Sequence, residues 1–303
     1  MLMDTCTSTV TPGDKMIFTL LILLHVCILT VDSKISPHSE GSGVIQQNVF
    51  PLDNAPESVD DMYYGCTPKM HEKVNNYLRS ELKNEIFKNI WTKSEKWAED
   101  KLKCNCNKLD LKLDHFKALY CYTYNKNHFY HNFMTAVRTK GPVYKSGFSY
   151  HAIHFLLSDA IRLLKKRQPE CVTTYRRTKD TFNVKDDTEI RFGSFTSSSL
   201  KSNLVKYGEQ DCFEIMTCYG ANLTCNEVTV DQEEVLIPPY EKFKIMPIED
   251  PKKVLNCKKL YKLTSSGIES NLNCLAVRTA NSGGQNLNLK AADVNAIVQP
   301  NAF

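Results

Sequence analysis

The stretch Asp231-Gln232-Glu233-Glu234-Val235-Leu236-Ile237-Pro238-Pro239 contains a clear strand signal with polar residues directly before it. Residues 235–237 favour extended backbone, and the two prolines cannot continue a strand ladder, so we expect a short strand that ends at Ile237. Because side chains alternate between the faces of a strand, Gln232 and Glu234 should project together, away from Glu233. This polar platform is a candidate site of chemistry.

Short strand-like runs fill the half of the chain around this stretch. They are separated by turn residues and comprise Val172–Tyr175, Ile190–Phe192, Phe213–Met216, Val228–Val230, Phe243–Ile245 and Leu260–Leu263. The sequence has no Gly-x-Gly-x-x-Gly or Walker-type loop, so a nucleotide would have to be held in another way. These runs predict the strand-rich part of the protein.

Helical periodicity dominates the first half of the chain. Apolar residues recur every four positions from Val74 to Ile90, which predicts one long amphipathic stripe that continues toward Trp97. The same spacing recurs at 129–137 and at 153–164, and we interpret these stripes, with the histidines at 151 and 154, as core. Helices followed by strands predict an α+β fold: an N-terminal helical lobe (55–169), then a mixed β core (170–280).

The N-terminus predicts export. Residues 16–31 are almost entirely apolar, and Lys15 precedes them. The run is shorter than the roughly 20 residues of a membrane span, so we expect a signal peptide at 1–33, with an uncleaved membrane anchor as the alternative. A polar linker (34–54) follows, and a flexible tail (281–303) lacks the apolar run of a GPI signal. The chain is thus expected to be secreted, without a stable membrane span.

The charge and the cysteine content indicate which partners and which cross-links the protein has. The net charge of +4 is spread over 303 residues without a long basic run, so we expect no nucleic-acid partner. Twelve cysteines include ten beyond the signal segment, an even number without paired zinc-knuckle spacings, which favours disulfides and no metal site. Asn222-Leu223-Thr224 is a glycosylation sequon.

Three ordered segments carry a family resemblance. Tyr175-Arg176-Arg177-Thr178 ends a predicted strand, Arg191 to Leu200 leads into a hydroxyl-rich turn, and the Gln232-Glu233-Glu234 strand comes third. Together they resemble the arginine, serine and glutamate triad of the secreted and GPI-anchored mono-ADP-ribosyltransferases of vertebrates, in particular of fish. Two flanking segments, 55–66 and 154–161, are also typical of that family, so the resemblance covers about residues 55–278.

The resemblance implies an enzyme that cleaves NAD and transfers ADP-ribose to a protein arginine. Arg176 would then hold the phosphates, Ser197 would orient the ribose, and Glu234 would stabilise the charge that develops on the ribose. NAD or NADP would be a substrate, and no metal would take part. The resemblance also implies disulfides, Cys66 with Cys274 and Cys171 with Cys218, and we consider Cys212 with Cys257; it leaves Cys104, Cys106, Cys121 and Cys225 without assigned partners.

Two residues depart from the family pattern. Gln232 stands where arginine-directed members carry glutamate, and an amide keeps a hydrogen bond but loses the charge that attracts a guanidinium. Arg177 stands where many relatives have a glycine that meets the nicotinamide, so we include both residues among the cofactor contacts. Two alternatives to arginine transfer therefore stay open: a glycohydrolase that uses water, and an inactive NAD-binding or extracellular interaction protein.

Overall fold

The computed structural model describes residues 49–104, 110–124, 128–184, 189–223, 232–246, 255–278 and 289–290. Contacts divide the chain into two units, Met1–Gln47 and Asn48–Phe303, and every described residue belongs to the second. The predicted signal peptide therefore lies outside the described residues. Within the described ranges, no helix combines the length and the apolar character that crossing a bilayer requires.

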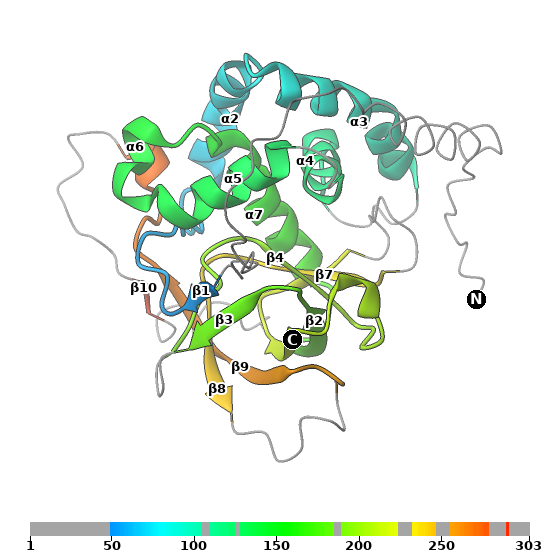
Figure 1. Ribbon diagram of the computed structural model, residues 1–303. Helices are drawn as coiled ribbons and strands as arrows, with labels where there is room; N and C mark the ends of the chain where they lie inside the picture. The colour runs from blue at the N-terminus through cyan, green and yellow to red at the C-terminus, as the bar shows by residue number, and fades with distance from the viewer. Residues whose placement is uncertain are drawn as a thin grey trace, which may run out of the picture. The chain divides into compact units, whose positions relative to one another are not determined.

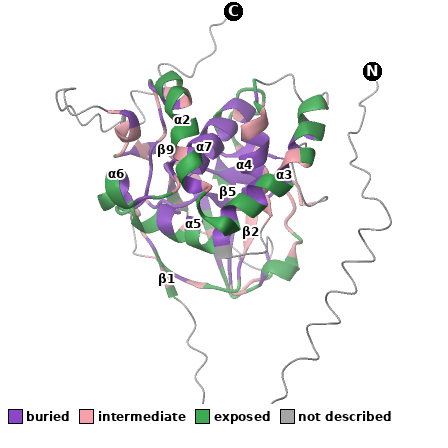
Figure 2. Cartoon of the chain, turned by 90° about the horizontal axis from the view of Figure 1, so that it is seen from above, coloured by how far each residue is buried: buried purple, intermediate pink, exposed green. Residues whose placement is uncertain are grey.

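The first part of the second unit is helical (Figure 1). Its helices are α2 (Thr67–Glu81), α3 (Glu85–Lys103), α4 (Leu113–Thr123), α5 (His128–Thr139), η2 (Gly141–Val143), α6 (Tyr144–Gly147) and α7 (His151–Lys165). Helix α7 is almost entirely buried (Figure 2). Its apolar residues pack in one core cluster with α2 to α5 and with Phe195 and Leu236 from the strand-rich part.

The apolar stripe predicted from Val74 toward Trp97 is divided between two helices. The side chain of Asn84 accepts a hydrogen bond from the backbone N–H of Phe87 at 3.1 Å and thereby caps α3. The break rotates the following helix, so Ile86, which the four-residue spacing assigned to the core, is 45% exposed. The spacing thus indicated the helical region but not the cap inside it.

The two histidines of α7 serve the core, as predicted. His154 is hydrogen-bonded through Nδ1 to the hydroxyl of Tyr63 at 2.8 Å and through Nε2 to the carbonyl of Val59 at 2.9 Å. The ring of His151 lies 4.7 Å from that of Tyr77. Burial lowers the pKa of His154 to about 3 and that of His151 to about 4, so both rings are neutral at physiological pH.

The second part is a mixed sheet, as the α+β prediction required. Its strands are β2 (Val172–Arg177), β4 (Thr196–Ser199), β5 (Asp211–Thr217), β6 (Ala221–Asn222), β7 (Glu234–Ile237), β8 (Glu241–Met246), β9 (Lys259–Ser270) and β10 (Leu289–Lys290). Their order is β10-β9-β5-β2-β4-β7-β6, with β8 also paired to β9. Only the β5–β9 pair is parallel among these described pairs. Two further strands, β1 (Val49–Leu52) and β3 (Thr181–Val184), form a separate parallel pair.

Two details differ from the sequence prediction, and a third predicted run cannot be compared. The hydroxyl-rich run that we predicted as a turn is strand β4, because it has pairing partners on both sides, β2 and β7. The run 190–192 forms only a single bridge, between Ile190 and Phe243. The run 228–230 lies outside the described residues. Pairing along the sheet, which a single segment does not reveal, decides the first two cases.

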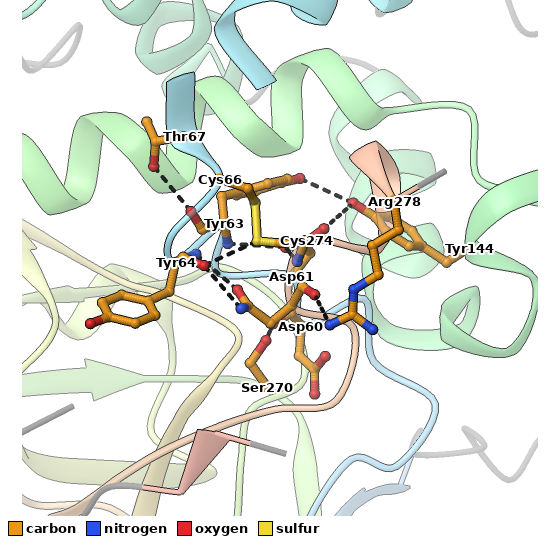
Figure 3. The surroundings of a disulfide bond; sticks show 11 residues. Asp60, Asp61, Tyr63, Tyr64, Cys66, Thr67, Tyr144, Ser270, Cys274 and Arg278 are labelled. Carbon is orange, nitrogen blue, oxygen red and sulfur yellow. Dashed lines mark hydrogen bonds between the residues drawn. A yellow bond between two sulfur atoms is a disulfide. The ribbon is translucent and has the colours of Figure 1, made fainter. Parts of the chain in front are cut away.

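The two disulfides that the resemblance implies, and the third pairing that we considered, are all present. Cys66–Cys274 joins the start of α2 to the segment after β9 (Figure 3), Cys171–Cys218 joins the residues flanking β2 and β5, and Cys212–Cys257 ties β5 to the segment before β9. Cys104 is also disulfide-bonded. Cys121 is a buried free thiol, the one such cysteine among the described residues.

Candidate active site

Strands β2, β4 and β7 are neighbours in the sheet, and each carries one residue of the predicted triad. Arg176 lies near the end of β2, Ser197 lies within β4, and Glu234 opens β7. The register pairs Ser199 with Tyr175 of β2 on one side and with Glu234 on the other. Because paired strands lie about 4.8 Å apart, the sheet brings three segments that are distant in sequence to one place.

Arg176 and Ser197 are in direct contact. Nη1 of Arg176 donates a hydrogen bond to the backbone carbonyl of Ser197 at 2.7 Å, which directs the guanidinium toward β4. A guanidinium has five N–H donors in a planar fork, so this one bond positions the group and leaves it able to bind further oxygen atoms. The pair can therefore act as an oriented anion-binding group beside a hydroxyl.

A tyrosine from the helical part completes this cluster. The hydroxyl of Tyr122, on α4, lies 2.9 Å from Oγ of Ser197. Burial raises the pKa of Tyr122 well above its ordinary value, and the nearby Tyr130 and Glu234 raise it further. The Ser197 bond and the charge of Arg176 lower it. The charges of Glu234 and Arg176 thus both influence the Tyr122 hydroxyl.

The three polar residues before the apolar run have different environments. Glu234 is buried, at 8% exposure, and its carbonyl accepts a hydrogen bond from the N–H of Leu223 at 2.7 Å. Glu233 has a φ of 45°, in the left-handed region, so the extended strand begins only at Glu234 and the predicted alternation through Gln232 does not hold. The Glu233 carboxylate instead lies 3.5 Å from Nζ of Lys201.

Gln232 is held by the last residue of β4 and by a residue that follows the strand. Its side-chain Oε1 accepts a hydrogen bond from the hydroxyl of Tyr207 at 2.8 Å. Its backbone carbonyl accepts one from Oγ of Ser199 at 2.5 Å. The amide therefore has a defined orientation two residues before Glu234.

The side chain of Arg177 contacts a different part of the sheet. Nε donates to the carbonyl of Ser202 at 2.8 Å, and Nη1 lies 3.4 Å from Sγ of Cys257 and 3.9 Å from a carboxylate oxygen of Glu209. Only 7% of the side chain is exposed. Its contacts with the described residues therefore lie beside the Cys212–Cys257 disulfide, while Arg176 faces β4.

A second guanidinium lies near Arg176. Burial lowers the pKa of Arg138, on α5, and the positive charge of Arg176 lowers it further. Nη2 of Arg138 donates to Oγ of Ser194 at 3.2 Å. Two neighbouring cations create a positive potential that suits an anion such as a phosphate. No motif in the sequence pointed to Arg138 or Tyr122, since both lie in the part of the chain that was predicted only as helical.

One group of potential metal ligands lies elsewhere, between α2, α4 and α7. Nε2 of His71 and Nε2 of His115 each lie 3.1 Å from Oδ2 of Asp159. Nδ1 of His115 accepts the backbone N–H of Lys112 at 2.9 Å, so a neutral His115 carries its proton on Nε2 and donates it to Asp159. A metal-binding histidine needs the opposite arrangement. Arg162 also donates to Asp159. The donor set fits a hydrogen-bond network better than a metal ion.

Comparisons with known proteins show the family of the chain. The family described as "NAD:arginine ADP-ribosyltransferase" has a sequence model that matches residues 52–258. An erythroblast NAD(P)(+)–arginine ADP-ribosyltransferase of Gallus gallus is 32% identical over 231 residues, which cover 74% of this chain and 76% of the relative. A T-cell ecto-ADP-ribosyltransferase 1 of Mus musculus is 34% identical over 203 residues, covering 64% of this chain and 68% of the relative.

Solved structures support the same assignment. The crystal structure of the eukaryotic mono-ADP-ribosyltransferase ART2.2 is 31% identical, with a TM-score of 0.65, and covers 75% of this chain and 99% of its own. A mutant of that enzyme in complex with NAD gives a TM-score of 0.64 at 30% identity, covering 75% of this chain and 99% of its own. The fold and these relatives thus define an enzyme that uses NAD as a substrate. The chain belongs to the NAD:arginine ADP-ribosyltransferase family, whose members transfer ADP-ribose from NAD to arginine.

Proposed function

We propose that Arg176, Ser197 and Glu234 bind NAD and break the bond between its nicotinamide and its ribose. The observation that supports this most is the chain of contacts from Arg176 through Ser197 to Tyr122, whose hydroxyl is also influenced by Glu234. It joins a guanidinium, a hydroxyl and a carboxylate across three adjacent strands. The three groups match the phosphates, the ribose hydroxyls and the reacting carbon of a dinucleotide.

The chemistry follows from the charge that develops during cleavage. The N-glycosidic bond breaks, its electron pair leaves with nicotinamide, and positive charge develops on the ribose. The carboxylate of Glu234 stabilises that charge, as carboxylates do in glycoside hydrolysis. Arg176 binds phosphate oxygens, and Ser197 orients the ribose with Tyr122 behind it. A nucleophile then forms a bond to the same carbon and loses a proton.

Arg177 has an indirect part in this proposal. Its contacts with Ser202, Glu209 and Cys257 support a role in holding the end of β2, next to Arg176. The contact between Arg177 and NAD that the sequence suggested stays a prediction. If it occurs, the guanidinium has to give up at least part of these bonds.

A pair of adjacent carboxylates provides the test. Glu234→Gln should reduce nicotinamide release from NAD by about 10²–10³-fold, the usual effect of removing one group that stabilises transition-state charge. Glu233→Gln changes the neighbouring residue, which is partly exposed and pairs with Lys201, so nicotinamide release should stay within a factor of about three. Equal rates for Glu234→Gln and the unmodified protein would discard the site.

A second activity, hydrolysis of NAD, is favoured by Gln232. Its amide lacks the charge that would attract a guanidinium, so water should compete with arginine as the acceptor. Incubation with labelled NAD and agmatine separates the two: ADP-ribosyl-agmatine reports transfer and free ADP-ribose reports hydrolysis. We expect both products, and Gln232→Glu should raise the transferred share several-fold. No change with Gln232→Glu would mean that this position does not select the acceptor.

We also propose where the enzyme acts and on which dinucleotide. The relatives named as ecto-enzymes support an extracellular location, and the apolar segment 16–31 supports secretion, with a membrane-anchored form as the alternative. Asn222 is the proposed glycosylation site. NADP is a proposed second substrate, supported by the NAD(P)(+) in the names of two Gallus gallus relatives. Competition of NADP against labelled NAD would measure that preference.

A further inference from the structure

The backbone directly before Glu234 is held by the end of β4. Oγ of Ser199 donates to the carbonyl of Gln232 at 2.5 Å, and the N–H of Leu200 donates to the carbonyl of Glu233 at 3.1 Å. Glu233 itself is in the left-handed region, with a φ of 45°. Such a conformation persists in a non-glycine residue only where its surroundings fix it. The two hydrogen bonds provide that fixation.

Side chains of residues 199–207 contact the same turn. The hydroxyl of Tyr207, in the short helix η3 (Val205–Tyr207), donates to Oε1 of Gln232 at 2.8 Å. Nζ of Lys201 lies 3.5 Å from the carboxylate of Glu233. Nζ of Lys206 lies 5.1 Å from the centre of the Tyr207 ring. One segment thus places a hydroxyl donor and the ammonium group of Lys201 at the turn, and the ammonium group of Lys206 beside the Tyr207 ring.

These contacts decide what the amide of Gln232 offers to an acceptor. A carboxamide is planar, with its oxygen and its NH₂ group at opposite corners. With Oε1 turned toward Tyr207, the Nε2 group points away from it. A guanidinium has only N–H donors and requires an acceptor opposite it, whereas a water molecule can accept a bond from Nε2.

We propose that Tyr207 is a positioning residue that sets the balance between water and arginine by fixing the Gln232 amide with its donor side outward. The inference rests on the proposed function and concerns only the second step. There, an oxygen or nitrogen lone pair forms the bond to the ribose carbon from which nicotinamide has departed, and the nucleophile releases a proton. Tyr207 does not touch that carbon; it acts through Gln232.

The test measures how NAD is partitioned in Tyr207→Phe. Labelled NAD is incubated with a fixed concentration of agmatine, and the ratio of ADP-ribosyl-agmatine to free ADP-ribose is determined. Loss of one neutral hydrogen bond allows the amide to present its oxygen, so the ratio should rise about five-fold. Val205→Ala is the matched control, because Val205 lies in the same short helix and is 54% exposed. It should leave the ratio unchanged.

Two results would overturn the proposal. The first is an unchanged ratio in Tyr207→Phe, even if total NAD cleavage falls, since that pattern would indicate only a structural role. The second is an equal rise in a Gln232→Met background, because Tyr207 would then act without the amide. Failure of the proposed function looks different: nicotinamide release would survive Glu234→Gln. Tyr207 is 42% exposed, so its phenylalanine variant should fold normally, and a thermal melt monitored by circular dichroism checks this.

Discussion

Two polar clusters of this protein contain similar groups but use them differently. The triad cluster on β2, β4 and β7 contains Arg176, which is partly exposed and makes one hydrogen bond to Ser197 among the described residues. The cluster beside the Cys66–Cys274 disulfide contains Arg191, whose side chain is 0% exposed and pairs with Asp60. Figure 3 shows Asp60 and Asp61 beside that disulfide. Both clusters combine an arginine with a carboxylate. They differ in how many hydrogen-bonding groups the fold itself satisfies.

Arg191 is fully engaged by the protein. Its guanidinium donates to Asp60 at 2.6 Å and to the backbone carbonyls of Asn54, Ala55 and Glu269 at 2.8, 3.1 and 2.9 Å. The carboxylate of Asp60 accepts further bonds from the segment after β9. A guanidinium with four of its five donors occupied by the protein stabilises the fold and has little capacity for a ligand. A conspicuous buried ion pair is therefore weaker evidence for a site than a partly satisfied arginine.

The largest effect should come from removing the buried guanidinium. Arg191→Met leaves the Asp60 carboxylate buried without its cation, which should lower the free energy of unfolding by about 3–5 kcal/mol. Urea denaturation measures this directly. The matched variant Arg176→Met removes a partly exposed arginine and should change the same free energy by less than about 1 kcal/mol, while it abolishes NAD cleavage. Similar destabilisation by both variants would remove the distinction between the clusters.

The sequence indicated the triad cluster better than the buried one. Arg176, Ser197 and Glu234 were found because each lies in a short motif and the three occur in a fixed order. Tyr122 was not found, because its bond to Ser197 joins a helix to a strand far along the chain, and no motif marks its own segment. The turn at Glu233 was also missed, since it depends on hydrogen bonds from the end of β4.

The fold predictions succeeded where one segment determines the structure and failed where contacts between distant segments determine it. Periodicity depends on one segment at a time, so helices α5 and α7 and strands β2, β5 and β7 were predicted. Strand β4 was predicted as a turn because serine and threonine runs resemble turns, and only its pairing with β2 and β7 makes it a strand. The small β1–β3 pair depends in the same way on contacts between distant segments.

An intermediate effect should appear in the pH dependence of stability. Burial raises the pKa of Asp61 to about 7, although the N–H groups of Cys274 and Tyr63 and the hydroxyl of Tyr144 lower it. The folded protein therefore keeps a proton that the unfolded chain releases near pH 4. This stabilising contribution is complete below pH 4 and is lost as the pH rises to 7, by an amount on the order of 4 kcal/mol.

Asp61→Asn tests this dependence, because the amide resembles the protonated acid and cannot ionise. Unfolding free energies measured by urea at pH 4, 5.5 and 7 should show the variant gaining on the unmodified protein as the pH rises. Glu81, whose pKa burial raises to about 8, titrates in both proteins and cancels in the difference. A difference that stays constant with pH would mean that Asp61 is ionised throughout. The buried cluster would then contain an ionised Asp61 carboxylate, and this difference from the triad cluster would be smaller than we infer.

The smallest effect concerns the hydroxyl that links the helical part to the triad. Tyr122→Phe removes the partner of Ser197 Oγ but leaves the ring in place, so kcat/KM for NAD cleavage should fall about five- to ten-fold, the value of one hydrogen bond. Tyr130→Phe is the control, because its ring lies 5.5 Å from that of Tyr122 in the same aromatic group. In a Ser197→Ala background, Tyr122→Phe should have almost no further effect, since the two residues act together. A full additional loss there would show that Tyr122 acts on the substrate by another route, and that the contact with Ser197 does not position the hydroxyl of the triad.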